Sequence, residues 1–314
     1  MHLPQTLHDD SHHRLTLFAA PGGSRRAVIC FEAGRDIMDG FVPTACPGFA
    51  VRAGIDAIMV QSARRDWFLS KGSDHLAKAL SAATAAYDEV TATGFSMGGY
   101  GALLYSRAAR VNRALLVSPQ YSIDPQTAPY DPDRHDKFRR IGLDMPRPEE
   151  WGDTDLRGVL IYDPSISADR EHAARITRAF PRLRLLALPY GGHPATSVLG
   201  EKGQVGKVSI MLVEGRLRLK EIRRRHRMAR RESPRYHLHL ARAAVARHPD
   251  RARQELLALA QNGSDHVRFE AGLALLPLDR APAMTALNNL FDGLPDIPAS
   301  WARRLQAALD DGTF

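Results

Sequence analysis

A single serine lies where a short apolar run gives way to a helix-forming stretch. Residues 90–104 read VTATGFSMGGYGALL, and the five residues from Gly94 to Gly98 match the pattern G-x-S-x-G. Because glycine lacks a Cβ, the chain can turn sharply around Ser96. The hydroxyl is then expected to project above a sheet, next to free helix N–H groups that favour negative charge. This pattern indicates a serine nucleophile, although a tight turn can also serve packing alone.

A serine nucleophile needs a base within hydrogen-bond reach, and that base needs a carboxylate to orient it. His193 is the best-placed histidine, because it follows the last strand-like run on a Gly191-Gly192 turn. The alternative is an ordinary loop histidine. Other histidines are expected in a mobile N-terminal tail, on helix or loop surfaces, or in the C-terminal part. The N-terminal cluster HDDSHH resembles a metal site in composition only, and a solvated tail is expected there.

Two acids compete for the third position. In a serine site of this pattern the acid precedes the histidine along the chain and follows a strand. The stretch GVLIYDPSISADREHA offers Asp163 at the end of a strand-like run and Asp169 six residues later. Asp163 is favoured because a proline follows it and predicts a loop. Asp169 precedes a helical pattern, so a role as helix N-cap is expected for it, with a place in the triad as the alternative.

The developing negative charge of an acyl-transfer intermediate needs two backbone N–H donors, which together form an oxyanion hole. Met97, directly after the serine, is expected to supply one. Position along the chain assigns the other to Ala33, in the segment FEAGRD that follows an early apolar run.

Residues that follow another predicted strand, and so lie at the same edge of the expected sheet, suggest ligand contacts. The segment RRDWFLS at 64–70 follows another strand-like run, and Arg64, Arg65 and Trp67 within it suit an anionic or sugar-like ligand. The favoured interpretation is that the indole is packed and the guanidinium groups are solvated, with ligand contacts as the alternative.

The elements that must hold these residues alternate along the first two thirds of the chain. Short aliphatic runs, apolar on both faces, predict strands at 14–20, 27–33, 56–62, 90–96, 114–119, 158–163 and 184–190. Helical patterns are expected at 75–87, 97–109, 169–180 and 195–214. Repeated strand–helix units predict a mostly parallel sheet with helices on both faces.

Three segments depart from this alternation. Residues 120–152 hold five prolines and many charges, which predict a small cap over the carboxyl ends of the strands, with a plain surface loop as the alternative. Residues 216–235 read as a basic linker or helix. Helical spacing then recurs at 236–248, 251–261, 266–276, 282–291 and 299–310, which predicts an all-α region over 236–314. The α/β part is therefore expected to span residues 1–215.

Charge and composition narrow the protein's class. The chain of 314 residues has a net charge of +8, and the segment 216–231 accounts for it with nine Arg or Lys against Glu221. A solvated helix or linker that joins the two domains is expected here, with binding of a protein or anionic partner as the alternative. The two cysteines, Cys30 and Cys46, form no disulfide framework or metal-ligand pattern. No signal peptide and no membrane-spanning run are expected, and a cytoplasmic location fits.

Together these features resemble the α/β-hydrolase superfamily over about residues 14–214. The resemblance rests on GFSMGG, the strand-end Asp163 and the GGH of 191–193. It implies an eight-stranded, mostly parallel sheet and a Ser–Asp–His triad, without a metal or cofactor. The usual His-Gly pair of the oxyanion loop is replaced by Glu32-Ala33-Gly34. SMGGYGALLYS with SPQYSID is similar to a bacterial subgroup linked to surface polysaccharide systems and glycoprotein secretion.

The expected activity is a serine hydrolase of the carboxylesterase type that cleaves an ester or related acyl bond. One alternative is an acyltransferase that uses the same triad with a sugar or alcohol acceptor. The other is a non-catalytic scaffold whose helical tail binds partners. Oligomeric state and substrate are not indicated by the sequence.

Overall fold

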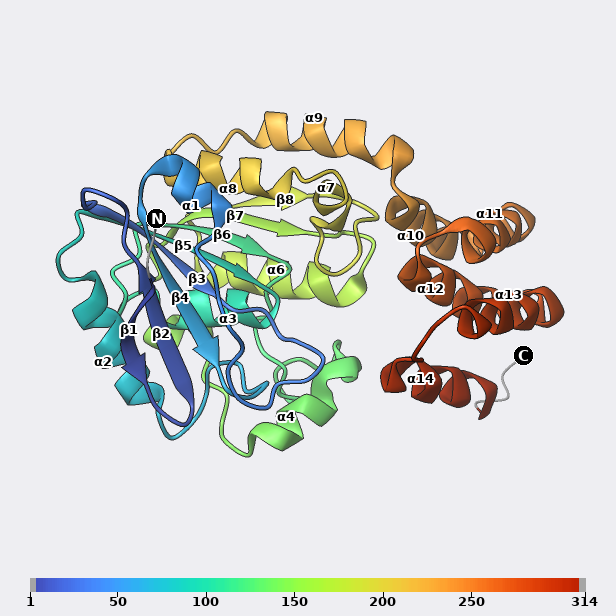
Figure 1. Cartoon of the computed structure of the whole chain (residues 1–314), viewed down its shortest axis with the longest axis horizontal. Helices are drawn as coiled ribbons and strands as arrows, with labels where there is room; N and C mark the ends of the chain where they lie inside the picture. The colour runs from blue at the N-terminus through green and yellow to red at the C-terminus, as the bar shows by residue number, and fades with distance from the viewer. Residues whose placement is uncertain (1–3, 311–314) are drawn as a thin grey trace. The chain divides into compact units, whose positions relative to one another are not determined.

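The computed structural model describes residues 4–310, and its elements follow one another in the order labelled in Figure 1. The strands are β1 (Pro4–Asp9), β2 (His13–Phe18), β3 (Arg26–Phe31), β4 (Asp56–Ser62), β5 (Glu89–Phe95), β6 (Arg113–Val117), β7 (Arg157–Tyr162) and β8 (Leu183–Ala187). The helices among them are α1 (Gly48–Ala53), α2 (Ser73–Thr84), α3 (Met97–Leu104), η1 (Pro132–Arg134), α4 (His135–Ile141), α5 (Pro148–Trp151) and α6 (Ser167–Ala179). After β8 come α7 (Ser197–Gly200), α8 (Val205–Val213), α9 (Leu219–Ala229), η2 (Arg230–Glu232), α10 (Pro234–Ala244), α11 (Pro249–Asn262), α12 (Asp265–Leu275), α13 (Arg280–Asp292) and α14 (Ala299–Asp310).

The eight strands form one sheet in the order β1-β2-β4-β3-β5-β6-β7-β8. From β4 through β3 to β8 every neighbouring pair is parallel, whereas β2 is antiparallel to both β1 and β4. Parallel strands place their carboxyl ends at one edge of the sheet, so the loops that follow β3, β5, β7 and β8 share that edge. The expected mostly parallel sheet is confirmed.

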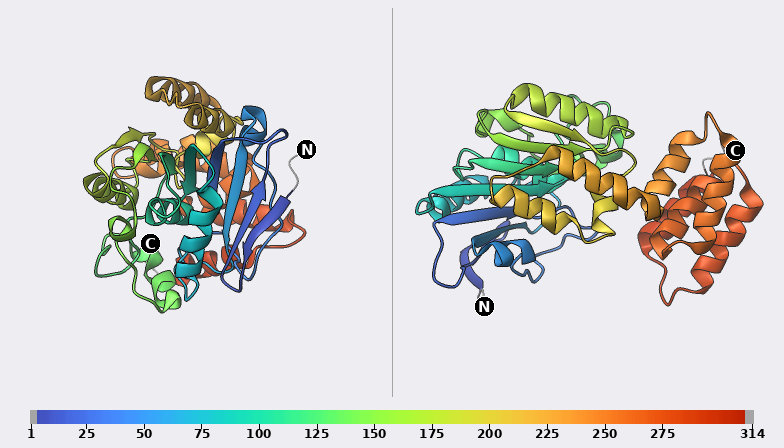
Figure 2. Two further views of the ribbon diagram at one scale, coloured as in Figure 1. Left: turned by 90° about the vertical axis from the view of Figure 1, so that its left-hand side faces the viewer. Right: turned by 90° about the horizontal axis from the view of Figure 1, so that it is seen from above.

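Helices cover both faces of this sheet (Figures 1 and 2). Alternate residues of β3 show why its sequence is apolar throughout. Ile29 and Phe31 pack in the large core with side chains of α2, α3 and α6, whereas Val28 and Cys30 pack with α1 and with Val213 at the end of α8. A strand with two buried faces needs apolar residues at every position, which produces a continuous run instead of an alternating pattern.

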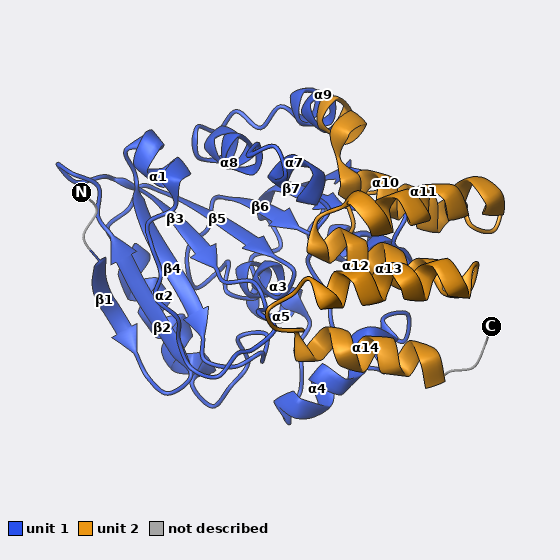
Figure 3. Ribbon diagram, turned by 45° about the vertical axis from the view of Figure 1, so that its right-hand side comes forward, with its two compact units in different colours: residues 1–189, 193–226 blue, residues 190–192, 227–314 orange. Residues whose placement is uncertain are grey.

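The chain divides into two compact units, coloured separately in Figure 3. Unit 1 comprises residues 1–189 and 193–226 and holds the sheet, and unit 2 comprises residues 190–192 and 227–314. The division falls within α9, between the expected boundaries at 215 and 235. Unit 2 contains α10 to α14, whose core is built mainly from leucine and alanine around Phe269. The predicted α/β fold with a helical C-terminal region is therefore correct.

The N-terminal region is where the structure differs most from the expectation. Residues 4–18 form the β1–β2 hairpin, and His13 at the start of β2 is fully buried, so this segment is not a mobile tail. Hairpin strands at a sheet edge pair through their backbones, which allows the polar sequence PQTLHD to form β1. The expected helix at 195–214 is two helices, α7 and α8.

Residues 120–152 contain η1, α4 and α5 and no strand. Across residues 4–310, no helix is both long and apolar enough to cross a membrane.

Candidate active site

Ser96 lies at a sharp turn between the end of β5 and the start of α3. Its φ of 50° lies in the left-handed region, which non-glycine residues seldom adopt. The flanking glycines permit the turn: a Cβ on Gly94 would lie 2.1 Å from the carbonyl oxygen of Gly98, and one on Gly98 would lie 2.4 Å from the carbonyl oxygen of Phe31. A hydrogen bond from the Ser96 N–H to the Val117 carbonyl, at 2.9 Å, fixes the turn to β6.

His193 and Asp169 complete a hydrogen-bonded chain with this serine. The Ser96 Oγ lies 2.8 Å from His193 Nε2, and His193 Nδ1 lies 3.0 Å from Asp169 Oδ1. The three residues follow β5, β7 and β8, whose carboxyl ends meet at one edge of the sheet. With Nδ1 donating to the carboxylate, Nε2 is left to accept the serine proton. The geometry is that of a nucleophile, a base and an orienting acid.

The expectation that Asp163 orients the histidine is wrong in this structure, because Asp169 holds that position. Asp163 Oδ1 instead accepts hydrogen bonds from the backbone N–H and the hydroxyl of Ser165, at 2.9 and 2.6 Å. This is the turn that an Asp forms with the residue two positions later. The expected N-cap role of Asp169 is also wrong: Ile166 is the N-cap of α6, and Asp169 lies within its first turn.

Asp169 is 2% exposed, yet its surroundings favour the charged form. Burial alone raises its pKa, but hydrogen bonds from His193 and Ser118, with the charge of Arg134, hold the pKa below its ordinary value. Ser118 also accepts the backbone N–H of Ala195 at 3.0 Å, so its hydroxyl connects the acid to the chain that follows His193. An ionised carboxylate at this position would stabilise an imidazolium.

The two expected oxyanion donors lie at the ends of β3 and β5. Met97 begins α3, and Ala33 follows Glu32, whose own N–H donates to the Val60 carbonyl at 2.9 Å. Within residues 4–310, the N–H groups of Met97 and Ala33 have no hydrogen-bond partner in the protein. Their oxyanion role stays a prediction.

The sequence analysis missed a buried amide beside the serine. Gln120 is fully buried, and its Nε2 donates to the Ser96 Oγ at 3.2 Å while its Oε1 accepts from the Trp67 indole at 3.1 Å. Trp67 is 2% exposed, which confirms the expectation that its indole is packed and contradicts the alternative that its face binds a ligand. Gln120 lies three residues after β6, at the same edge of the sheet as Ser96. This position in the sequence could have indicated a residue of the site.

Arg134, in the segment expected to form a cap, is a second residue that the sequence analysis missed. Its Nη2 lies 3.3 Å from His193 Nε2, and its Nη1 donates to Asp131 Oδ1 at 2.7 Å. The other oxygen of Asp131 accepts from His172 Nε2 at 2.9 Å. His172, expected at the surface, is fully buried, and its Nδ1 accepts from the Tyr121 N–H at 3.1 Å. The cap segment thus places the guanidinium of Arg134 next to His193 of the triad.

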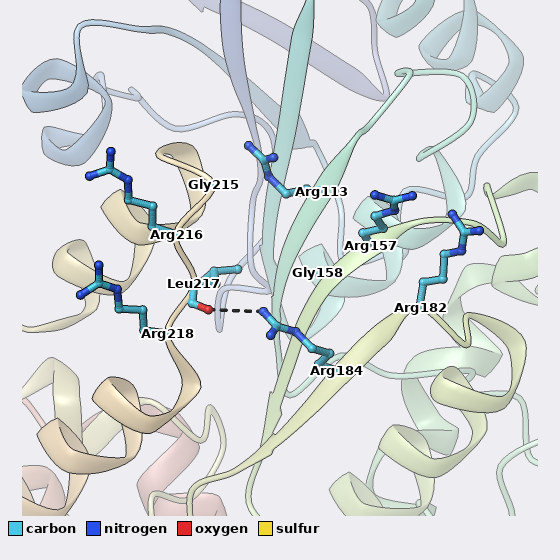
Figure 4. Close-up of a pocket in the computed structure, with 9 residues that line it drawn as sticks. All are labelled: Arg113, Arg157, Gly158, Arg182, Arg184, Gly215, Arg216, Leu217 and Arg218. Atoms are coloured by element: carbon cyan, nitrogen blue, oxygen red, sulfur yellow. Dashed lines mark hydrogen bonds between the residues drawn. The ribbon is translucent and has the colours of Figure 1, made fainter.

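A separate basic pocket of about 680 Å³ lies at the opposite edge of the sheet, where β6, β7 and β8 begin (Figure 4). Six arginines line it: Arg113, Arg157, Arg182, Arg184, Arg216 and Arg218. Figure 4 shows the Arg184 guanidinium directed at the Leu217 carbonyl, 3.3 Å away. Among the described residues Arg157, Arg216 and Arg218 form no ion pair, whereas Arg182 lies 3.3 Å from Asp155.

Within residues 4–310, no group of three or more His, Cys, Asp or Glu side chains is arranged to hold a metal ion. That includes the described part of the N-terminal cluster HDDSHH.

Comparison with known proteins found no matching family model and no matching curated protein. Solved structures are similar at low identity. The capsule O-acetyltransferase of Neisseria meningitidis serogroup A is 11% identical with a TM-score of 0.46, over 64% of this chain and 94% of that one. Est1E from Butyrivibrio proteoclasticus is 13% identical with a TM-score of 0.45, over 68% and 99%. The esterase Pf2001 from Pyrococcus furiosus is 15% identical with a TM-score of 0.41, over 67% and 89%.

Proposed function

We propose that this chain, which has the α/β-hydrolase fold followed by a helical C-terminal region, is a serine hydrolase of the carboxylesterase type. One observation carries the proposal: the continuous hydrogen-bonded chain from Ser96 Oγ through His193 to Asp169, with contacts of 2.8 and 3.0 Å. A serine on a turn with positive φ, bonded to an imidazole that is held by a buried carboxylate, is organised for acyl transfer.

The reaction would proceed in two halves. Ser96 Oγ attacks the ester carbonyl carbon as His193 Nε2 takes its proton, and Asp169 stabilises the resulting imidazolium. The N–H groups of Met97 and Ala33 are proposed to bind the oxyanion. The C–O bond to the alcohol breaks, Nε2 returns the proton to the leaving oxygen, and an acyl-serine remains. Water then attacks the acyl carbon as His193 Nε2 takes its proton. The bond from the acyl carbon to Ser96 Oγ breaks, Nε2 returns the proton to Oγ, and the acid is released.

Acyl transfer is the second candidate, and it shares the first half of this reaction. A sugar or other alcohol hydroxyl would take the place of water in the second half. Adding such an acceptor to the assay separates the two: diversion of the acyl group to the acceptor at the expense of free acid supports a transferase.

A fluorophosphonate probe tests the proposal most directly, because it reacts covalently with an activated serine. We expect labelling of Ser96 in the folded wild-type protein and none in Ser96→Ala. Turnover of 4-nitrophenyl acetate should fall in the variant by at least about 10³-fold. Ser81→Ala, which changes an exposed serine in α2, is the matched control. Equal turnover in wild type and Ser96→Ala would refute the proposal, and unlabelled folded wild type would favour a non-catalytic scaffold.

We also propose that the basic pocket of Figure 4 binds an acidic polypeptide partner. Its support is the concentration of guanidinium groups, with no aromatic side chain among the lining residues to stack nucleic-acid bases. Labelled poly-aspartate should bind the wild type and lose affinity at raised salt. Arg216→Glu with Arg218→Glu should abolish that binding. Undiminished binding by this double variant would exclude the basic pocket as the binding site for poly-aspartate.

A further inference from the structure

Arg134 contacts the triad, and its charge lowers the pKa of both Arg65 and Lys137, so the three side chains lie near one another. We call Arg65, Arg134 and Lys137 the cationic cluster. Arg134 is the member closest to the reacting atoms, with Nη2 at 3.3 Å from His193 Nε2. Lys137 lies three residues later, in the first turn of α4. Arg65 follows β4, and a Cβ on Gly34 would meet its Nε at 3.2 Å, so Arg65 packs against the loop that carries Ala33.

The positive charge of this cluster is only partly compensated. Asp131 bonds to Arg134, but the same carboxylate also accepts from His172. In the part of the chain that the structure describes, neither Arg65 nor Lys137 forms an ion pair, and Arg65 donates to the Arg35 carbonyl instead. Burial and the charges of Arg134 and Arg65 lower the pKa of Lys137, and the opposing effect of Asp131 and Asp133 does not restore it. Cations brought together with partial loss of water favour the binding of an anion.

A pocket of about 780 Å³ adjoins the cluster and has Arg65 and Lys137 in its wall. This volume lies within the roughly 300–1,000 Å³ that is typical of small-molecule sites. Its charged lining consists of Arg64, Arg65, Lys71, Lys137, Arg140, Asp36, Asp39 and Asp66, with His12. Cations therefore outnumber carboxylates there. Asp66 Oδ1 is also engaged by the Ser62 hydroxyl and the Phe68 N–H, at 2.6 and 2.9 Å.

The position of Arg134 indicates which part of a substrate the anion belongs to. In the proposed reaction, His193 Nε2 delivers its proton to the alcohol oxygen, whereas the oxyanion faces Met97 and Ala33. A guanidinium 3.3 Å from Nε2 is therefore beside the alcohol portion. We propose that this alcohol portion, whether it leaves in hydrolysis or accepts in transfer, carries a carboxylate or phosphate bound by the cationic cluster. The inference rests on the proposed function and adds a substrate class to it.

Three acetyl esters with matched alcohol portions test this. The alcohols are 4-hydroxybenzoate, 4-hydroxyphenyl phosphate and, as the uncharged reference, 4-hydroxybenzamide. Each kcat/KM is divided by the ester's own rate of hydroxide hydrolysis, so that leaving-group reactivity is removed. The wild type is expected to favour at least one anionic ester over the amide by tenfold or more, and the better anion distinguishes carboxylate from phosphate. A corrected ratio near one for both anions would overturn the inference.

Variants of the cationic cluster test whether its residues cause the preference for anionic esters. Lys137→Met and Arg134→Gln should each lower the anion-to-amide ratio by about tenfold, with the change mainly in KM. Arg139→Gln is the matched control, because Arg139 lies on the same helix, is exposed and pairs with Asp136. It should leave the ratio unchanged. A ratio that survives both cluster variants would overturn the inference even if the wild type prefers anions.

Failure of the proposed function is recognised separately, by absence of fluorophosphonate labelling and of turnover for all three esters. In that case calorimetric titration with 4-hydroxybenzoate and 4-hydroxybenzamide measures the affinity of the cationic cluster for each compound directly. Binding of the benzoate by wild type and its loss in Lys137→Met would support an anion site without catalysis. Equal affinities for benzoate and amide, or no binding of either, would overturn the inference as well.

Discussion

His193 donates through Nδ1 to Asp169 across 3.0 Å, although the two residues lie 24 positions apart and follow different strands. This contact fixes the imidazole tautomer, because a carboxylate accepts only from a protonated nitrogen. Asp169→Asn should lower kcat by about 10³–10⁴-fold, since an amide can donate to Nδ1 and favour the wrong tautomer. The measurement is single-substrate kinetics with 4-nitrophenyl acetate.

Asp163→Asn is the comparison variant for this prediction. Asp163 is fully buried, and its Oδ1 accepts from Ser165 and not from His193. An Asn keeps that acceptor, so kcat of Asp163→Asn is expected to change far less than kcat of Asp169→Asn. Urea unfolding checks that both variants are folded. If both variants fold and kcat falls further in Asp163→Asn than in Asp169→Asn, Asp163 is the acid of the triad.

Gln120 is expected to connect the serine to the core through Trp67. Gln120→Leu removes the amide that donates to Ser96 and leaves the buried Trp67 indole N–H without its acceptor. An unsatisfied buried donor costs about 1–3 kcal/mol, so the free energy of unfolding should fall by that amount. Trp67→Phe should rescue part of this loss in the double variant. Strictly additive losses in urea unfolding would show that the contact contributes no coupling.

The sequence predicted the sheet because its central strands are buried on both faces and are therefore apolar at every position. Seven strands and the helices of unit 2 were located within a few residues. β1 was missed because it is an exposed edge strand, whose pairing depends on the backbone and leaves no apolar pattern. The nucleophile and base were also suggested by sequence, since each lies at a turn with a glycine signature.

The positions of the remaining site residues depend on the path of the loops that carry them, and the sequence does not specify that path. Asp163 and Asp169 both follow β7, and the path of the chain into α6 decides which carboxylate faces His193. Arg134 reaches the triad only because the prolines and charges of 120–152 fold into η1 and α4. Composition predicted an irregular segment there, but no local pattern reveals which of its side chains turns inward.

His13 should make the protein sensitive to mild acid. Its ring is fully buried, lies 6.4 Å from the ring of Phe68, and has no hydrogen-bond partner for either nitrogen among the described residues. Burial lowers its pKa to about 4 from 6.5. The unfolded chain therefore binds a proton that the native state rejects, and stability falls as pH drops from about 6.5 to about 4.

His13→Phe should remove this sensitivity and leave stability at pH 7 unchanged or increased. Integrated over that interval, the histidine accounts for roughly 3 kcal/mol of acid destabilisation. Urea unfolding at several pH values measures it, with His75→Gln, at an exposed position of α2, as the control. An identical pH dependence in His13→Phe and wild type would contradict the assignment.

Glu270 should also make unit 2 lose stability in acid, but through a carboxylate that the native state holds charged. Its Oε2 accepts from Arg242 at 2.7 Å and its Oε1 from Arg304 at 2.5 Å, which joins α12 to α10 and α14. Burial alone would raise its pKa, but the hydrogen bonds from the two arginines hold it at about 2. Because this value lies below the ordinary 4.5, the stabilisation is complete above about pH 4.5 and is lost as pH falls toward 2.

Glu270→Gln should therefore destabilise unit 2 at pH 7 by about 1–2 kcal/mol, a value reduced because both guanidinium groups are partly exposed to water. Hydrogen exchange of peptides from α10, α12 and α14 measures the loss where it occurs. Glu255→Gln is the control, because Glu255 of α11 is half-buried and its contact to His237 Nδ1, at 3.2 Å, is more exposed. The difference between Glu270→Gln and wild type should shrink steadily below pH 4.5, because protonation removes from the wild type the same charge that the substitution removes. A difference that is independent of pH would mean that Glu270 stabilises the helices through packing and not through its charge.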